Sequence, residues 1–204
     1  MSVVNESYRT VAGRGKGRFE VRGSEFIGHV RPAETLEDAE EFIETVAREY
    51  ADATHNVPAY RVRAEPLREY ASDDNEPSGS AGKPALNVLQ QEELENVVAV
   101  VTRYYGGTNL GVGRLARAYA RGVKVALADT TIVEQRPRER FTIHVEYDDS
   151  GTVRGILESA AVEFDATYEA TVTFDVRTPT DEASALRDRI RSATSGRAAF
   201  EEAE

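Results

Sequence analysis

The stretch VVAVVTRYYGGTNLGVGRLARAYARGVKVALA, residues 97–128, constrains the fold more than any other part of the chain. It opens with a nearly continuous apolar run that ends at Tyr105, a pattern typical of a strand buried on both faces. Gly106, Gly107 and Gly111 then indicate a turn, and apolar residues at helical spacing continue to about Ala128. The stretch therefore predicts a buried strand, a glycine-rich turn and a helix.

The residues before this stretch predict both strands and helices. Residues 8–32 alternate β-forming residues with glycine turns and predict two or three strands. Residues 35–50 have apolar side chains at helical spacing, and Thr35 with Asp38 forms the pattern of a capping box. Residues 59–74 predict strand interrupted at Pro66, and a short helix is expected from Ala85 toward Leu94.

The chain changes character at Gln135, Arg136 and Pro137, which predict a linker. Beyond it we expect a strand over 141–147, a helix over 150–160, strands over 162–168 and 170–178, a helix after a Thr180 cap, and a last strand over 197–201. This βαββαβ order is that of ferredoxin-like domains. The prediction is an α+β protein with an N-terminal domain over 1–134 and a ferredoxin-like domain over 138–204.

Composition excludes several classes of function. The 204 residues contain no run of about 18 apolar residues, and the N-terminus lacks the blocks of a signal peptide, so we expect a cytoplasmic protein with no membrane partner. The absence of cysteine excludes disulfides, thiolate metal sites and cysteine nucleophiles. His29 and His144 form no ligand pattern with His55, so we expect no metal and no cofactor.

The acidic charge of the chain makes its acid-free segment informative. The formal net charge is −11 and the chain has only three lysines, a balance that indicates a halophilic source. Acidity is then a background adaptation and does not by itself argue against nucleic acid. Residues 96–128 contain no aspartate or glutamate, although the average density of the chain would place about six there.

The helix in this segment has a cationic face. Arg114, Arg117, Arg121 and Lys124 recur at helical spacing, opposite an apolar face that includes Leu115, Tyr119, Gly122 and Ala126. Such a face suits an RNA backbone, while arginine on a solvated helix is the ordinary alternative. The glycine turn adds backbone N–H groups at a helix N-terminus, where phosphates bind, but it matches neither the phosphate-loop motif nor a dinucleotide fingerprint.

Two polar segments lie before this stretch in the chain, ATHNVPAY and SDDNEPSGSAGKP. If these segments form a catalytic site, His55 is a general base oriented by the Glu76 carboxylate, and Ser78 or Ser80 is the nucleophile. Read as structure, His55 caps a helix end and the serines form hydroxyl turns. No motif with catalytic spacing favours the enzyme, so we assign no catalytic residue.

These segments carry a resemblance to a known family. In order along the chain, ATHNVPAY, DDNEPSGSAGKPALNVL and VVAVVTRYYGGTNLGVGRLARAYARGV resemble the IMPACT family, which includes the bacterial YigZ proteins. The resemblance implies an N-terminal domain similar to the second domain of ribosomal protein S5, and a C-terminal domain similar to domain V of the translocation elongation factor. Eukaryotic members regulate translation, so it also implies a translation-linked or ribosome-linked role. Asn75, Ser80, Thr108, Asn109 and Arg114 depart from the usual family pattern.

We therefore predict a non-enzymatic regulator of translation that binds RNA or the ribosome, with a protein of the translation machinery as a further partner. The alternative is an enzyme or sensor that binds a small phosphorylated ligand at the glycine turn. The cations Arg14, Lys16 and Arg18 would extend the surface. The predicted RNA- or phosphate-binding residues are Arg103, Tyr104, Tyr105, Gly106, Gly107, Asn109, Gly111, Arg114, Arg117, Arg121 and Lys124, and the polar cluster beside them comprises His55, Asn56, Asp74, Glu76, Ser78, Ser80 and Lys83.

Overall fold

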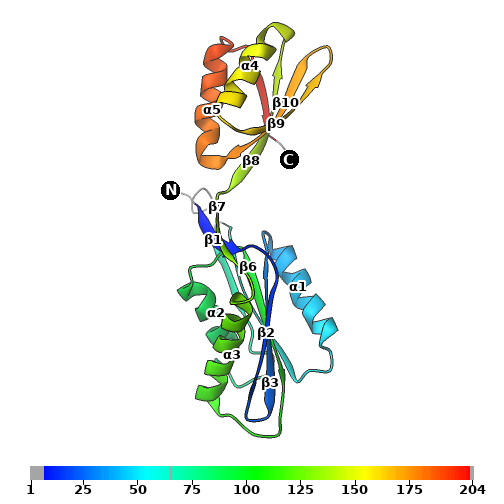
Figure 1. Ribbon diagram of the computed structural model, residues 1–204, viewed down its shortest axis with the longest axis vertical. Coiled ribbons are helices and arrows are strands. Elements are labelled where there is room, and N and C mark those ends of the chain that lie inside the picture. Colours follow the sequence, from blue (N-terminus) through cyan, green and yellow to red (C-terminus); the bar gives the residue numbers. More distant parts are fainter. Residues whose placement is uncertain (1–6, 65, 203–204) are drawn as a thin grey trace. The chain divides into compact units, whose positions relative to one another are not determined.

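The computed structural model describes residues 7–64 and 66–202, and the chain separates into two compact units, Met1–Gln135 and Arg136–Glu204. Each unit combines a β-sheet with α-helices (Figure 1). The predicted α+β class with two domains is confirmed.

The N-terminal unit is built on a five-stranded antiparallel sheet with strand order β2-β3-β6-β4-β5. A separate pair, β1 with β7, joins the start of the unit to its end. The strands are β1 Tyr8–Val11, β2 Gly15–Val21, β3 Ser24–Pro32, β4 His55–Val62, β5 Arg68–Ala71, β6 Val97–Tyr104 and β7 Ile132–Gln135.

Strand β6 is the central strand of this sheet, and every residue from Val97 to Arg103 is buried. Val97, Ala99 and Val101 belong to a core beneath helices α2 (Gly82–Gln91) and α3 (Val112–Leu127). Val98 and Val100 belong to a second core beneath helix α1 (Leu36–Glu49). Helices therefore cover both faces of β6, as the unbroken apolar run predicts.

The helices of this unit begin at residues with clear local causes. Helix α1 has the predicted capping box, because Thr35 accepts from the Asp38 N–H while the Asp38 side chain accepts from the Thr35 N–H. Helix α2 begins at Gly82, three residues before the predicted Ala85, and ends at Gln91. Pro84 falls in its first turn, where a missing N–H costs no hydrogen bond.

The C-terminal unit has the predicted βαββαβ order, and its antiparallel sheet is ordered β11-β8-β10-β9. The expected Thr180 cap is wrong: Thr180 is the first residue of α5, and the cap position is Pro179 with no side-chain hydrogen bond. The elements are β8 Arg138–Val145, α4 Tyr147–Ser159, β9 Glu163–Tyr168, β10 Val172–Pro179, α5 Thr180–Ala193 and β11 Ala199–Glu202.

Among the described residues, no helix has the length and apolar character needed to cross a membrane. This agrees with the absence of a long apolar run in the sequence.

His29 on β3 makes the stability of the N-terminal unit depend on pH. Its side chain is buried, and burial, with a smaller effect of Lys16, lowers its pKa to about 4. The unfolded chain takes up this proton near pH 6.5, so the native state loses stability as the pH falls from about 6.5 to 4. We expect His29→Gln to remove about 3 kcal/mol of that loss, measured as the difference between the two proteins in urea unfolding at pH 7 and pH 4. Equal losses for the two proteins would contradict the assignment.

Candidate nucleic-acid interface

Helix α3 has the two faces that the sequence predicts. Arg114, Arg117, Arg121 and Lys124 are exposed, and we call these four residues the cationic stripe. The opposite face packs on the sheet and contributes the buried residues Leu115, Tyr119, Gly122 and Ala126. The apolar face fixes the orientation of the helix, so the stripe points to solvent.

The cations of the stripe lack acidic partners. Within residues 7–64 and 66–202, no ion pair joins any of the four to a carboxylate. Arg121 instead lies over the ring of Phe19 on β2, with its guanidinium carbon 4.3 Å from the ring centre. The stripe therefore keeps its charge available on a protein whose net charge is −11.

The glycine turn before α3 is closed at one end and open at the other. The Gly106 N–H donates to the Ser24 hydroxyl over 3.1 Å, so this predicted phosphate donor already has a partner. Gly107 and Asn109 are exposed, and the Asn109 side chain accepts from the Tyr105 hydroxyl over 3.1 Å. Gly111 occupies the cap position with φ of 76°, and no side chain caps the helix. The Arg114 N–H already donates to the Gly111 carbonyl over 3.0 Å, so only the amides of Val112 and Gly113 precede the first hydrogen bond of the helix.

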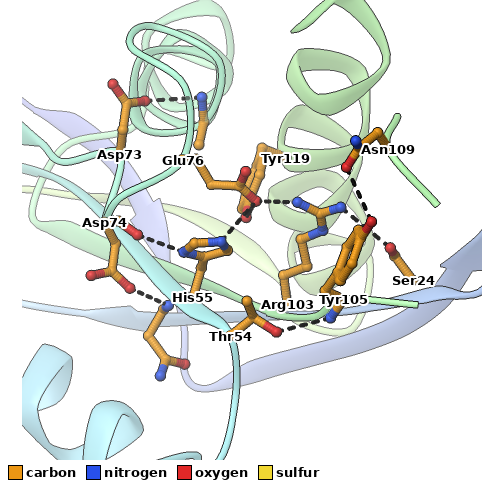
Figure 2. Close-up of polar contacts among 12 residues, drawn as sticks. Ser24, Thr54, His55, Asp73, Asp74, Glu76, Arg103, Tyr105, Asn109 and Tyr119 are labelled. Carbon is orange, nitrogen blue, oxygen red and sulfur yellow. Dashed lines mark hydrogen bonds and ion pairs between the residues drawn. The ribbon is translucent and has the colours of Figure 1, made fainter. Parts of the chain in front are cut away.

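Arg103 does not belong to the surface on which the sequence analysis placed it. Its side chain is only 5% exposed, and its Nη1 donates to Glu76 Oε1 over 2.5 Å (Figure 2). Its Nη2 donates to the Ser24 hydroxyl over 3.3 Å, and its guanidinium lies between the rings of Phe26 and Tyr105. The side chain points from the central strand into a polar interior and is not available to a phosphate.

Glu76 is the centre of that polar interior. Its side chain is 3% exposed, and Oε1 also accepts from the Tyr119 hydroxyl over 2.6 Å (Figure 2). Burial, followed by this hydrogen bond, raises the pKa of Tyr119 far above its usual value. His55 Nε2 lies 3.7 Å from the same oxygen, while Nδ1 lies 2.6 Å from the Asp74 carbonyl. A carbonyl only accepts, so Nδ1 carries a proton.

The serines do not complete a catalytic arrangement around His55. Ser78 is exposed, and Ser80 is fully buried with no hydrogen-bond partner for its hydroxyl. In the part of the chain that the structure describes, no hydrogen bond joins either serine to His55. A nucleophile needs its base within hydrogen-bond reach, so the geometry offers no support for that alternative.

The other members of the predicted polar cluster have separate surroundings. Asn56 is the second residue of β4. Its N–H donates to Asp74 Oδ2 over 2.6 Å, and its side-chain oxygen accepts from the Thr102 hydroxyl. His55 likewise begins β4 and does not cap a helix. Lys83 is exposed in the first turn of α2.

Sequence reasoning missed two contributors to this site, Ser24 and Tyr119, and it counted Asp73 among the polar residues of its segment without giving it a role. Asp73 holds the loop before α2 by accepting from the N–H groups of Gly79, Ala81 and Gly82. Burial alone would raise the pKa of Asp73, but these three bonds hold it below its usual value. For Tyr119 a signal was present, because a tyrosine on a buried helix face needs a partner for its hydroxyl.

The two tyrosines at the end of β6 differ in availability. The Tyr104 hydroxyl donates to Asp52 over 2.8 Å, and this bond raises the pKa of Tyr104 to about 12. Tyr105 is 46% exposed, and its N–H donates to the Thr54 hydroxyl. Tyr105 therefore remains the better candidate for stacking on a base.

The fold and the site define a class: a two-domain α+β protein with a cationic helix beside a glycine turn. Residues 22–127 match the family model of the Impact N-terminal domain, and residues 143–197 match that of a domain of unknown function, DUF1949. The chain belongs to the IMPACT family.

Similar proteins come from bacteria and mammals. The chain is 34% identical to IMPACT family member YvyE of Bacillus subtilis, over 97% of this chain and 92% of that protein. It is 36% identical to IMPACT family member YigZ of Escherichia coli, over 68% of this chain and 69% of that one. Protein IMPACT of Rattus norvegicus is 30% identical over 46% of this chain and 30% of its own length. A crystal structure of a hypothetical protein superimposes with a TM-score of 0.70 at 30% identity, covering 98% of both chains.

Proposed function

We propose that this protein is a non-enzymatic regulator of translation that binds RNA, free or in the ribosome, through the cationic stripe of α3. Membership of the IMPACT family supports a role connected with translation, because that is what the family resemblance implies. RNA binding rests on the charges of the described residues.

The observation that carries the proposal is the stripe of four exposed cations without carboxylate partners on an acidic protein. Like charges three and four residues apart repel one another and weaken a helix. Salt bridges at the same spacing would relieve that repulsion, yet residues 96–128 contain no acid. A polyanion supplies the missing counter-charges along the whole length of the helix.

The surrounding residues have different parts in this proposal. Gly107, Asn109 and Gly111, with the open first turn of α3, contact a phosphate beside the stripe, and Tyr105 stacks on a base. The buried network of Glu76, Arg103, Tyr119 and His55 positions the end of β6 and α3 without touching RNA. In this proposal Arg103 and the polar cluster do not contact RNA, and they support the surface that does.

One observation favours a second candidate function. The N-terminus of α3 has no side-chain cap and no acid in its first turn, while Arg114 lies in that turn. A small phosphorylated ligand would fit these features without using Arg121 or Lys124. The two functions therefore differ in whether the far end of the stripe matters.

Binding to single-stranded RNA at several salt concentrations tests the proposal. In the double variant Arg121→Glu with Lys124→Glu we expect the affinity for RNA to fall at least tenfold. The slope of log K against log salt concentration should become shallower by about 1.4, which is about 0.7 for each lost phosphate contact. These two residues lie at the end of α3 away from the glycine turn. Sedimentation with ribosomes from the same host, with and without ribonuclease, then distinguishes free RNA from the ribosome.

The matched control is Arg48→Glu with Arg68→Glu. Both residues are exposed, on α1 and β5, and the double reversal changes the net charge by the same amount. The control should keep affinity within about twofold of the native protein. Equal losses of RNA affinity in the two double variants would mean that only the net charge of the protein matters. Unchanged affinity in both would mean that the stripe does not contact RNA.

A further inference from the structure

A cavity of about 310 Å³ lies on the α1 side of the sheet and is lined by residues of β2, β3 and α1. Phe42 and Val46 on α1 give it an apolar wall. Phe42 also has the guanidinium groups of Arg14 and Arg31 near its ring. Apolar walls with a few polar groups are the usual character of a ligand site.

His29 is the buried polar group of this cavity. It is 6% exposed, and its Nε2 has no hydrogen-bond partner in the described parts of the chain. Its ring packs at a tilt against Tyr50, with 5.0 Å between ring centres. An unpaired buried polar atom costs stability, so a ligand that pairs with His29 Nε2 would recover that cost.

The remaining polar groups of the cavity are of both signs. Arg14 and Lys16 supply donors, Thr45 supplies a hydroxyl, and Glu49 with Asp129 supplies acceptors. Lys16 is held in place, since its Nζ donates to the Tyr50 hydroxyl over 2.6 Å and its N–H donates to Asp129 over 3.0 Å. The two carboxylates would repel a phosphate group placed inside.

A nucleobase fits this combination better than an anion does. A base is planar and apolar on its faces, and its edges carry donors and acceptors together. Guanine is the best match, because its N–H groups suit a carboxylate while its O6 and N7 suit Arg or Lys. The phosphates of the same nucleotide would remain outside, near the exposed Arg14 and Arg18, of which Arg18 also pairs with Glu25.

Strand β2 connects this cavity with the cationic stripe. It is the edge strand of the sheet, and a Cβ on Gly15 would overlap the carbonyl oxygen of Ala126, so α3 packs directly against its backbone. On one face of β2, Phe19 lies under Arg121; on the other, Lys16 lines the cavity. An RNA strand that follows the stripe and crosses this edge therefore arrives at the cavity.

Building on the proposed function, we infer that the cavity between α1 and the β2–β3 hairpin receives one unpaired base of a bound RNA strand, with guanine preferred. Only a single strand can turn a base into it, because a paired base is held in the stack. Such a pocket would add base specificity to a surface that otherwise recognises only charge.

The test uses labelled oligouridine of about twelve nucleotides that carries one guanosine, one abasic site or neither. We expect the guanosine strand to bind roughly tenfold more tightly than the other two, and more tightly than the same strand in a duplex. Thr45→Tyr, which fills the cavity from α1, should abolish the difference. The matched control Thr45→Ala leaves the cavity open and should preserve it. Guanosine 5′-monophosphate should compete better than ribose 5-phosphate with the native protein, a measurement that needs no variant.

The possible failures are distinguishable. Equal affinity for the guanosine and abasic strands, with binding still weakened by Arg121→Glu and Lys124→Glu, overturns the base pocket and leaves the proposed function standing. A guanosine preference that survives Thr45→Tyr in a folded protein also overturns the assignment to this cavity. The absence of binding to every strand overturns both.

Discussion

Glu76→Leu should lower the free energy of unfolding of the N-terminal unit by about 3 to 5 kcal/mol, because it leaves the buried guanidinium of Arg103 without its counter-charge. The same change removes the acceptor of the Tyr119 hydroxyl. Urea denaturation followed by tyrosine fluorescence measures the loss.

Two further variants separate the unpaired charge from simple loss of packing. Glu76→Leu combined with Arg103→Met removes both charges, and we expect this double variant to be more stable than Glu76→Leu alone. Glu25→Ala breaks the pair with Arg18, whose side chain is 71% exposed, and should cost less than about 1 kcal/mol. If the double variant is as unstable as the single one, the network does not stabilise the unit through its charges.

Gly28→Ala should destabilise the same unit by about 3 kcal/mol through overpacking. Gly28 lies on β3 directly beneath α3, and a Cβ there would overlap the carbonyl oxygen of Gly122. Backbone cannot move aside as a side chain can, so α3 would have to lift from the sheet. The midpoint of urea unfolding reports the change.

Gly113→Ala is the matched control for this effect. Gly113 lies in the first turn of α3, and the nearest atom to an added Cβ is Arg117 Nη1 at 3.9 Å. The substitution should raise stability by up to about 0.5 kcal/mol, since alanine favours helix over glycine. Similar midpoints for the two alanine variants would mean that α3 does not rest on Gly28.

Elements with strong local patterns were predictable from the sequence. The apolar run of β6 indicated burial on both faces, Thr35 and Asp38 marked the start of α1, and the spacing of apolar residues fixed the faces of α3. Boundaries without such signals were less accurate. Helix α2 starts at Gly82 and not at Ala85, and the pairing of β1 with β7 was not expected because their partners are more than a hundred residues apart.

In the candidate site, too, some features follow from the local sequence and others depend on residues that are distant in the chain. The exposure of the stripe follows from helical periodicity, which places Arg114, Arg117, Arg121 and Lys124 away from the core. The burial of Arg103 does not follow from its neighbours in the chain. It depends on Glu76 and Ser24, which come from distant segments and meet it only in the folded unit.

By itself, the sequence determined most of the elements, the α+β class, the βαββαβ order and the charged face of α3, because each depends on residues close together in the chain. Only the tertiary structure decided which charges are free and which are paired. Pairing depends on which groups face a side chain across the fold. Arg103 is therefore buried against Glu76, and a cavity lies beside His29.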